Sequence, residues 1–585
     1  MYDLLIRGGT IVDGNGGQPY EGDLAIMDGK IAQIGTVDGA ARQEIDAKGA
    51  IVTPGVIDVH THYDGQAVWD ADLAPSSWHG VTSVLMGNCG VGFAPLRPGD
   101  QDRLVSLMEG VEEIPGTALH EGLDWRWESF GDYMDRLDAI PHAINIATQI
   151  PHDPVRLFVM GDRAEAREVA TEEDVEAMAA LVHEGLKAGA FGFSTGRTDT
   201  HRTSDGHDTP ASVAERRELE GLASAFQGVP YRILSAVSDF DMHDGEERFD
   251  PEFDILETMA RIAGRPMTLS TMQRFLFPEQ WKRIAGRIEG ARASGLDMRM
   301  QVAPRGVGVL QGLRTTLNAL VGKPSYRKIM DLPFEEKLKA LHDPELRAKI
   351  LSEERIRVSD VDPAAPPQID QVLDNLDFLS ARMFPLGDPP NYEPAPEESI
   401  LARAQARGVD VLEELYDQML SDHGETMIYF PIFNYNDGNL DVVHEMMSHP
   451  AAHLGLGDGG AHVGTIVDSA WSSFFLSHWT RDRVQGQGAQ IPIERAIQMM
   501  SADQADFLGL KDRGRLVPGL AADINVIDME RLKVRRPHMI YDLPAGGRRL
   551  VQEAEGYIAT LVAGVPILEN DKLTGATPGR LLRAA

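Results

Sequence analysis

Short apolar runs recur through the middle of the chain and alternate with longer segments in which apolar residues recur every three or four positions. The short runs are typical of buried strands and the longer ones of amphipathic helices, such as those expected over 172–188 and 251–263. This alternation predicts βαβ units with parallel strands. The expected strands are Val56–Val59, Thr82–Met86, Ile144–Gln149, Ala190–Ser194, Tyr231–Ser235, Met267–Ser270, Met298–Val302 and His453–Gly457.

An α/β fold with eight such strands is most simply closed as a distorted (β/α)8 TIM-type barrel, which we expect over residues 55–512. The interval between the seventh and eighth strands is long and contains helical patterns over 333–341 and 344–354. We therefore expect an insertion at about 305–425, of the kind that often forms a lid or an interface.

Both ends of the chain show a different pattern, in which short alternating stretches are separated by turns such as Asp13–Gly17. Residues 1–54 are too few to bury both faces of a sheet, and similar strands recur near the end. Because chain ends commonly lie together in compact proteins, residues 1–54 and 513–575 are expected to form one small β-sandwich domain. The late strands are predicted over 522–528, 557–563 and 565–568.

The formal net charge of −35 argues against nucleic acid as a partner, because such proteins need a basic surface. No apolar stretch reaches the roughly 20 residues needed to span a bilayer, so no membrane partner is expected. The start lacks the features of a secretory signal, and a single cysteine, Cys89, excludes an intrachain disulfide. These features predict a cytoplasmic protein with a small-molecule substrate. The acidic surface and the insertion are compatible with a homo-oligomer.

His60 and His62 lie two residues apart at the end of the first predicted strand. Alternate residues of a strand point to the same face, so both imidazoles can approach one metal ion. Such a pair is often only hydrogen-bonded, but the carboxyl end of a barrel strand is where these folds build active sites. Asp458 follows the last strand and would face the same mouth, as a metal ligand and a general base.

Cys89 lies between glycines just after the second strand. A thiolate is a good zinc ligand, and flexible glycines let the backbone approach a metal. A buried, unreactive thiol in a tight loop is the alternative, and the sequence leaves both open.

Four motifs carry a resemblance to a known family: His60-Thr61-His62, Asn88–Gly92, Gly192–Gly196 and Gly457–Gly459. Framed by the two terminal β-segments, they resemble the amidohydrolase superfamily, and within it the N-acyl-D-amino-acid deacylase (D-aminoacylase) group. The resemblance covers nearly the whole chain and is weakest across the insertion.

The resemblance implies a distorted TIM barrel with a β-sandwich, zinc at the barrel mouth, and hydrolysis of an amide on a D-amino acid. By position, His60 and His62 match the family's first-strand ligands, Cys89 its cysteine ligand and Asp458 its catalytic aspartate. The implied reaction is hydrolysis by metal-activated water, with Asp458 passing the proton to the leaving amine.

The sequence also departs from this pattern. The family carries a histidine ligand on strand five and another on strand six, but residues 231–235 and 269–273 contain none. Residues 190–196 lack the lysine that other amidohydrolases use on strand four. We therefore expect one zinc ion held by His60, His62 and Asp458, with Cys89 as a weaker neighbour, and leave a second ion open. Substitute ligands would be His152, His201, His207 or His462.

Arg305 after strand seven and Arg197 after strand four are candidates to bind a substrate carboxylate. A structural salt bridge is the alternative for each, and Gln273 stands where the family usually has lysine. Two rival functions follow from these departures: an amidohydrolase acting on a cyclic amide, a lactone or another C–N bond, and a non-catalytic barrel that serves as a binding module.

Overall fold

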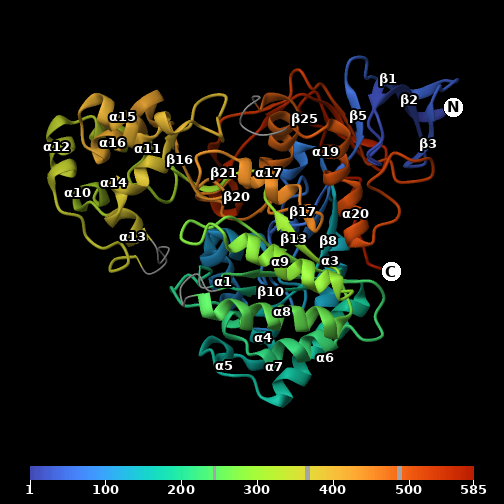
Figure 1. Cartoon of the computed structure of the whole chain (residues 1–585), viewed down its shortest axis with the longest axis horizontal. Coiled ribbons are helices and arrows are strands. Elements are labelled where there is room, and N and C mark those ends of the chain that lie inside the picture. Colours follow the sequence, from blue (N-terminus) through green and yellow to red (C-terminus); the bar gives the residue numbers. More distant parts are fainter. Residues whose placement is uncertain (199, 241–245, 363–368, 484–489) are drawn as a thin grey trace.

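The computed structural model describes residues 1–198, 200–240, 246–362, 369–483 and 490–585. Figure 1 shows three groups of elements: parallel strands with flanking helices, a sheet near the N-terminus, and a lobe of short helices at the opposite side. Within the described ranges, every helix is too short or too polar to cross a membrane.

The middle region contains parallel strands that form two sheets. They are β6 (Val56–Asp58), β7 (Val81–Met86), β8 (Asn145–Thr148), β9 (Ile150–Pro151), β10 (Gly192–Arg197), β11 (Ile233–Ser238), β12 (Met267–Ser270), β13 (Met298–Val302) and β17 (Ala452–Leu454). The first three form one sheet and the other six a second, in the order β17-β13-β12-β11-β10-β9. Gln149 alone separates β8 from β9, so these two strands connect the sheets along the chain.

The first and last strands of this order are linked just beyond their ends. The Asp458 amide donates to the His60 carbonyl at 3.0 Å, and the His62 amide donates to the Gly459 carbonyl at 2.7 Å. Thr61 and Gly459 form a parallel bridge. The segment that follows β17 therefore lies beside the segment that follows β6.

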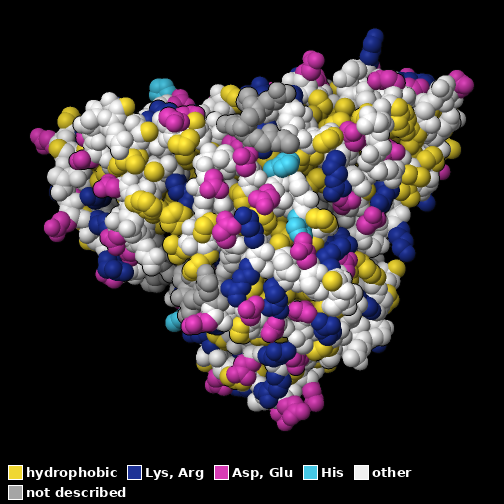
Figure 2. All heavy atoms as spheres, in the orientation of Figure 1, with side chains coloured by type: hydrophobic (Ala, Val, Ile, Leu, Met, Phe, Trp, Pro, Cys, Tyr) yellow, Lys and Arg dark blue, Asp and Glu magenta, His cyan; other side chains and the backbone are white. Residues whose placement is uncertain are grey.

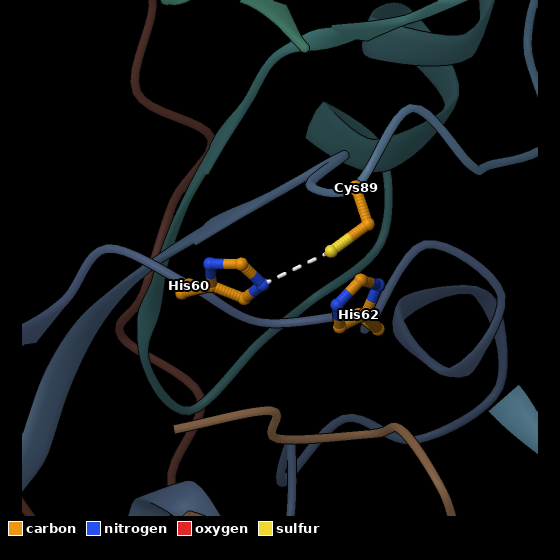
Figure 3. A group of neighbouring side chains, drawn as sticks. All are labelled: His60, His62 and Cys89. Carbon is orange, nitrogen blue, oxygen red and sulfur yellow. Dashed lines mark hydrogen bonds between the residues drawn. The ribbon is translucent and has the colours of Figure 1, made fainter. Parts of the chain in front are cut away.

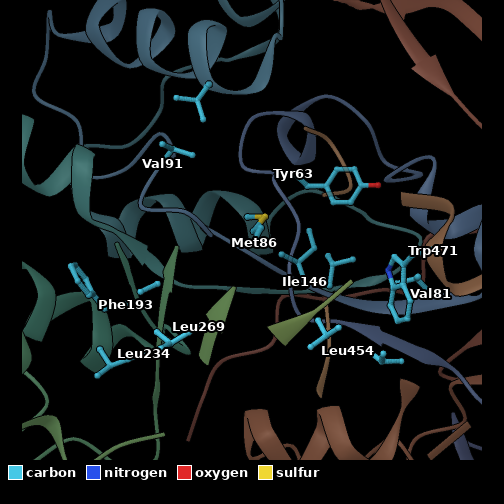
Figure 4. Packing of buried hydrophobic residues seen from close by; sticks show 14 of the residues in the cluster. Tyr63, Val81, Met86, Val91, Ile146, Phe193, Leu234, Leu269, Leu454 and Trp471 are labelled. Atoms are coloured by element: carbon cyan, nitrogen blue, oxygen red, sulfur yellow. The ribbon is translucent and has the colours of Figure 1, made fainter. Parts of the chain in front are cut away.

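Both faces of these strands are buried, as expected of parallel strands covered by helices. Neighbouring residues of β8 and β11 enter different apolar clusters: Ile146 and Leu234 contribute to one, Ala147 and Ile233 to the other. Figure 4 shows side chains from successive strands meeting in the larger cluster. Phe507 belongs to the smaller one, which lies against a helix near the chain end.

The helices predicted between strands are present. Thr171 caps α6 (Glu172–Ala188) by accepting from the Asp174 amide, and Gly189 ends it in a left-handed conformation. The helices of this region are α1 (Gln101–Glu112), α2 (Gly116–Gly122), α3 (Phe130–Asp138), α4 (His152–Met160), α5 (Asp162–Glu165), α7 (Arg216–Ser224), α8 (Phe249–Ala263), α9 (Gln280–Ala293), α17 (Asp441–Met447), α18 (Trp471–Phe474), α19 (Ile493–Met500) and α20 (Ala502–Leu508).

One nine-stranded sheet contains strands from both ends of the chain. Its members are β1 (Tyr2–Ile11), β2 (Tyr20–Met27), β3 (Lys30–Gly35), β4 (Ala41–Asp46), β5 (Ile51–Pro54), β18 (Ile524–Ile527), β23 (Tyr557–Val562), β24 (Val565–Glu569) and β25 (Lys572–Leu573). β5 and β18 join the two ends by antiparallel pairing, with Val52 opposite Val526. β1 continues through a bulge near Gly8 (φ 63°) and Gly9, which interrupts its register with β2.

The long interval before β17 builds a lobe with its own apolar core, which includes Leu320, Leu341, Leu415 and Ile428. The helices expected over 333–341 and 344–354 occur as α11 (Phe334–Leu341) and α12 (Pro344–Ser352). The lobe also contains β14 (Val307–Gln311), α10 (Pro324–Arg327), α13 (Ile369–Asp374), α14 (Leu376–Leu379), β15 (Phe384–Pro385), α15 (Ile400–Arg407), α16 (Val411–Gly424) and β16 (Ile428–Phe433). Two small two-stranded sheets follow near the end: β19 (Lys533–Val534) with β22 (Ala554–Glu555), and between them in the chain the hairpin of β20 (His538–Leu543) with β21 (Gly547–Val551).

Charged side chains of both signs are spread over the face shown in Figure 2, where Lys and Arg are interspersed with Asp and Glu. Many of them pair, as Arg287 does with Asp250 and Asp254 between α9 and α8.

Candidate metal centre

His60, His62 and Cys89 converge beyond the ends of β6 and β7. One ligand atom of each lies within 4.8 Å of the other two, and His60 Nε2 is 3.3 Å from Cys89 Sγ. Figure 3 shows the two imidazoles and the thiol gathered around a common point. Both histidines are buried and the cysteine is partly buried, so bulk water has little access to the cluster.

The loop after β7 turns back sharply to bring the thiol to this point. Cys89 has a left-handed backbone (φ 55°), a conformation that is rare for residues other than glycine. A Cβ at Gly87 would lie 2.3 Å from the Gln149 carbonyl, so the close packing of this loop requires glycine there. The side-chain Nδ2 of Asn88 donates to the Thr61 carbonyl at 3.2 Å, which ties the loop to the segment between the two histidines.

Asp458 reaches the same cluster from the loop after β17. Its Oδ1 is 3.3 Å from His60 Nε2 and 3.7 Å from His62 Nε2. Asp458 also has a left-handed backbone (φ 46°), and a Cβ on Gly457 would lie 2.3 Å from Asp58 Oδ2. Non-glycine residues in this conformation concentrate at functional sites, where surrounding contacts hold the strain.

Gln301 on β13 defines the tautomer of His60. The amide oxygen of Gln301 lies 2.5 Å from His60 Nδ1 and can only accept, so Nδ1 carries the proton. Nε2 then has its lone pair free on the side of Cys89 and Asp458. A metal-binding histidine usually donates its other N–H to such an acceptor, which orients the ring.

Glu112, the last residue of α1, lies beside His62 but makes no hydrogen bond of acceptable geometry with it. Its Oε1 is 3.0 Å from His62 Nδ1, while Nε2 of that ring faces Asp458. Glu112 is 1% exposed. Each histidine of the pair therefore has an oxygen acceptor beside Nδ1 and turns Nε2 toward the shared point.

Burial determines the protonation of these groups. It lowers the pKa of His60 to about 4 and holds the pKa of His62 well below its usual value. It also raises the pKa of the Cys89 thiol and of Asp458 well above their usual values, and nearby carboxylates add to both effects. Near pH 7 both imidazoles are accordingly neutral, which is the form that binds metal ions.

The donor set fits a divalent transition-metal ion. Two ligands of a tetrahedral ion lie roughly 3.3–3.6 Å apart when metal–ligand distances are about 2.0–2.3 Å. The contacts of His60 Nε2 with Cys89 Sγ and with Asp458 Oδ1, both 3.3 Å, agree with this spacing. Imidazole and thiolate donors favour such ions over Mg²⁺ or Ca²⁺, which take oxygen ligands.

Of the other four candidate histidines, His462 lies beside Glu112 and His201 lies within electrostatic range of the cluster. His462 Nε2 is 3.8 Å from Glu112 Oε2, and His201 contributes to the lowered pKa of His60 and of His62. His152 is instead held on both ring nitrogens by Thr195 and Glu218. The side chain of His207 is 60% exposed beside Asp205.

Both predicted carboxylate anchors are already engaged by carboxylates of the chain. Arg197 forms a two-point pair with Glu252 and also donates to the Ala214 carbonyl at 2.8 Å. Arg305 is buried and donates to Asp468 and to the Val467 carbonyl. These contacts favour the structural role that the sequence left open for each arginine.

Glu112 and Gln301 were missed from the sequence. Gln301 carried a weak signal, since it is a polar residue in the otherwise apolar end of a buried strand. Glu112 carried none, because it ends a helix whose partners are set only by folding.

Among known proteins, a model of the amidohydrolase family matches residues 43–568 of this chain. The chain belongs to the amidohydrolase family. Within it the chain falls in the D-aminoacylase group, as the motifs indicated. A D-aminoacylase of Alcaligenes xylosoxydans xylosoxydans is 26% identical over 596 residues, covering 99% of this chain and 97% of the relative.

Two further proteins similar to this chain are N-acyl-D-glutamate deacylases. An N-acyl-D-glutamate deacylase of the same organism is 32% identical over 309 residues, which cover 52% of this chain and 57% of that one. The structure of an N-acyl-D-glutamate deacylase from Bordetella bronchiseptica, complexed with zinc and a phosphonate inhibitor, aligns over 100% of both chains with 23% identity and a TM-score of 0.64. That likeness shows a shared fold.

Family membership identifies this amidohydrolase as a metal-dependent hydrolase of carbon–nitrogen bonds other than peptide bonds. The donor set at the ends of β6, β7 and β17 is where the described residues fit such an ion.

Proposed function

We propose that this amidohydrolase removes the acyl group from an N-acyl-D-amino acid, using zinc held by His60, His62, Asp458 and Cys89. The convergence of these four side chains on one point carries the proposal. The relatives named D-aminoacylase and N-acyl-D-glutamate deacylase support the substrate class.

The proposal includes the architecture. The parallel order from β6 to β17, together with the Thr61–Gly459 bridge, supports a closed and distorted (β/α)8 barrel over residues 55–512. The sheet that joins both chain ends supports a separate β-domain from residues 1–54 and 513–575. A barrel of this kind carries its active site at the carboxyl ends of its strands.

In the reaction, a divalent ion supplies Lewis-acid activation of water and of the scissile carbonyl. Asp458 accepts the proton that the water loses and gives it to the nitrogen of the leaving amine, so the amide yields a carboxylate and an amine. Gln301 keeps His60 in the tautomer that leaves Nε2 unprotonated.

One observation favours a second candidate function, the hydrolysis of a cyclic amide. Because Arg197 and Arg305 already pair with Glu252 and Asp468, neither offers a free guanidinium fork to a substrate carboxylate. A substrate without a carboxylate, such as a cyclic amide, would need no such anchor.

The test is a substrate comparison on the zinc-loaded protein, with N-acyl-D-amino acids, their L-enantiomers and cyclic amides assayed side by side. Hydrolysis of the D-compounds in preference to both other classes is the expected result. Turnover of the cyclic amides alone would replace the first proposal by the second. No turnover of any amide by the metal-loaded protein would remove both.

A further inference from the structure

The loop from Gly87 to Gly90 is tied to neighbouring elements by its backbone. The Gly87 amide donates to Asp64 Oδ2 at 3.1 Å, and the Asp153 amide donates to the Gly90 carbonyl at 2.8 Å. Cys89, inside this loop, has a left-handed backbone (φ 55°). Because such a backbone is unfavourable for a residue with a side chain, contacts with the surrounding structure must hold it in place.

Ser194 on β10 holds the residues on both sides of Cys89 with one hydroxyl group. Its Oγ accepts from the Gly90 amide at 3.0 Å and donates to the Gly87 carbonyl. A Cβ on Gly196 would lie 2.4 Å from the Cys89 carbonyl, so the backbone of β10 packs directly against the loop. This strand therefore supports the loop that carries the thiol.

Gln149, the residue between β8 and β9, contacts the same loop with its side chain. Its Nε2 donates to Asn88 Oδ1 at 2.9 Å, and its Oε1 accepts from the Ser235 hydroxyl on β11 at 3.0 Å. The Nδ2 of Asn88 donates in turn to the Leu85 carbonyl at 2.9 Å and to the Thr61 carbonyl at 3.2 Å. Thr61 is the residue between the two histidines of the candidate centre.

These side chains form a continuous and buried chain of hydrogen bonds. Ser235 is 7% exposed, and Gln149 and Asn88 are each 0% exposed. Each amide donates with its nitrogen and accepts with its oxygen, so the chain runs in one direction from β11 to the main chain beside the histidines. It links the six-stranded parallel sheet to the three-stranded one. A buried polar atom that loses its partner is costly, so removing one member forces the others to rearrange.

We infer that Gln149 and Ser194 are positioning residues for Cys89, which hold the loop so that its thiol points toward His60 and His62. Neither residue belongs to the group of potential ligands itself. The inference rests on the proposed function only where it gives the thiol a metal ion to bind. Removing either side chain should let the left-handed backbone of Cys89 relax and turn the thiol away from the imidazoles.

The variants Gln149→Leu and Ser194→Ala test this with two readouts. In Co²⁺-loaded protein, a bound thiolate gives a charge-transfer band in the near ultraviolet, which should be present in the wild type and lost in both variants. In metal-free protein, alkylation of the single cysteine of the chain should be several-fold faster in the variants. Gln504→Leu is the matched control. Gln504 is also 0% exposed and donates to the Leu454 and Met499 carbonyls, and its replacement should leave both readouts at the wild-type values.

A variant with both readouts at the wild-type values would remove its residue from the positioning role. The same changes in the Gln504→Leu control would show general destabilisation and overturn the inference for both residues. If Gln149→Leu does not fold, Ser194→Ala carries the test, since it removes a single hydroxyl group. A wild type without the band, with alkylation still faster in the variants, would refute Cys89 as a ligand in the proposed function and leave the positioning role standing.

Discussion

Two of the buried histidine–carboxylate pairs in the described residues differ in what surrounds them. His152 Nε2 is 2.9 Å from Glu218, its Nδ1 is 2.9 Å from Thr195, and Glu218 also pairs with Arg156. In the pair of His62 with Glu112, both carboxylate oxygens lack a partner among the described residues. The first pair is completed by the protein itself, whereas the second leaves His62 Nδ1 and both Glu112 oxygens without a hydrogen-bond partner in the described residues.

The two histidines differ in the partners of their ring nitrogens and not in their burial. Both rings are buried, and burial lowers the pKa of each. Burial and pKa alone therefore do not distinguish them. The distinction lies in whether each ring nitrogen finds its partner within the chain, and in the left-handed backbone of Cys89, Asp458 and His462 around only one of the two pairs.

The largest effect should come from Asp458→Asn. Removing a general base typically costs about 10²- to 10⁴-fold in turnover, and kcat should fall by that amount. Metal content and the urea midpoint should stay close to wild type, because His60, His62 and Cys89 remain. Substantial residual kcat in a metal-loaded variant would remove Asp458 from the general-base role.

Glu218→Gln should damage stability and leave the metal centre intact. It strips Arg156 of its buried partner, and breaking a buried ion pair costs about 3–5 kcal/mol. Urea unfolding measures the loss. The control is Glu220→Gln, whose surface pair with Arg216 should be worth about 0–1 kcal/mol. Equal losses in both variants, or loss of metal from Glu218→Gln, would erase the contrast between the two pairs.

Gln301→Leu should weaken the affinity for the first ion about 10- to 100-fold, because the His60 tautomer loses its acceptor. Gln301→Glu keeps an oxygen at this position and should restore most of the affinity. Competition with a metal-binding dye gives both dissociation constants. An unchanged constant in Gln301→Leu would show that Gln301 does not orient the ring.

The smallest effect concerns pH and the structural pair. The pKa of His152 is below its usual value when folded, so the unfolded chain takes up a proton first as pH falls below about 6.5. His152 thus contributes stability at neutral pH that is lost on acidification. The stability advantage of wild type over His152→Asn should narrow between pH 7.5 and 5.5. A stability difference between wild type and His152→Asn that grows as pH falls would show that folding does not lower the pKa of His152.

Much of the fold follows from local pattern. The strands at 267–270 and 298–302 and the helix at 172–188 have the bounds that periodicity and capping predict. Strand β4 was missed, because Ala41–Asp46 is mostly exposed and lacks a regular apolar face. Local patterns predict an element well only where a substantial part of it is buried in the core.

The residues of the candidate site likewise divide into those that the sequence predicts and those that it does not. His60, His62, Cys89 and Asp458 could be named because each follows a strand, and parallel strands bring their carboxyl ends together. Glu112 could not, since its place depends on how α1 packs over the strands. The arginines are a related case: a guanidinium at a strand end reveals nothing about which carboxylate of the chain will reach it.

The most direct test of the central claim is the metal content of the purified protein, measured by elemental mass spectrometry beside a His60→Ala, His62→Ala double variant. We expect at least one tightly bound zinc ion per chain in the wild type and its loss in the variant. Circular dichroism should show that the variant remains folded. A wild type without metal, or a folded variant that keeps the full metal content of the wild type, would contradict it.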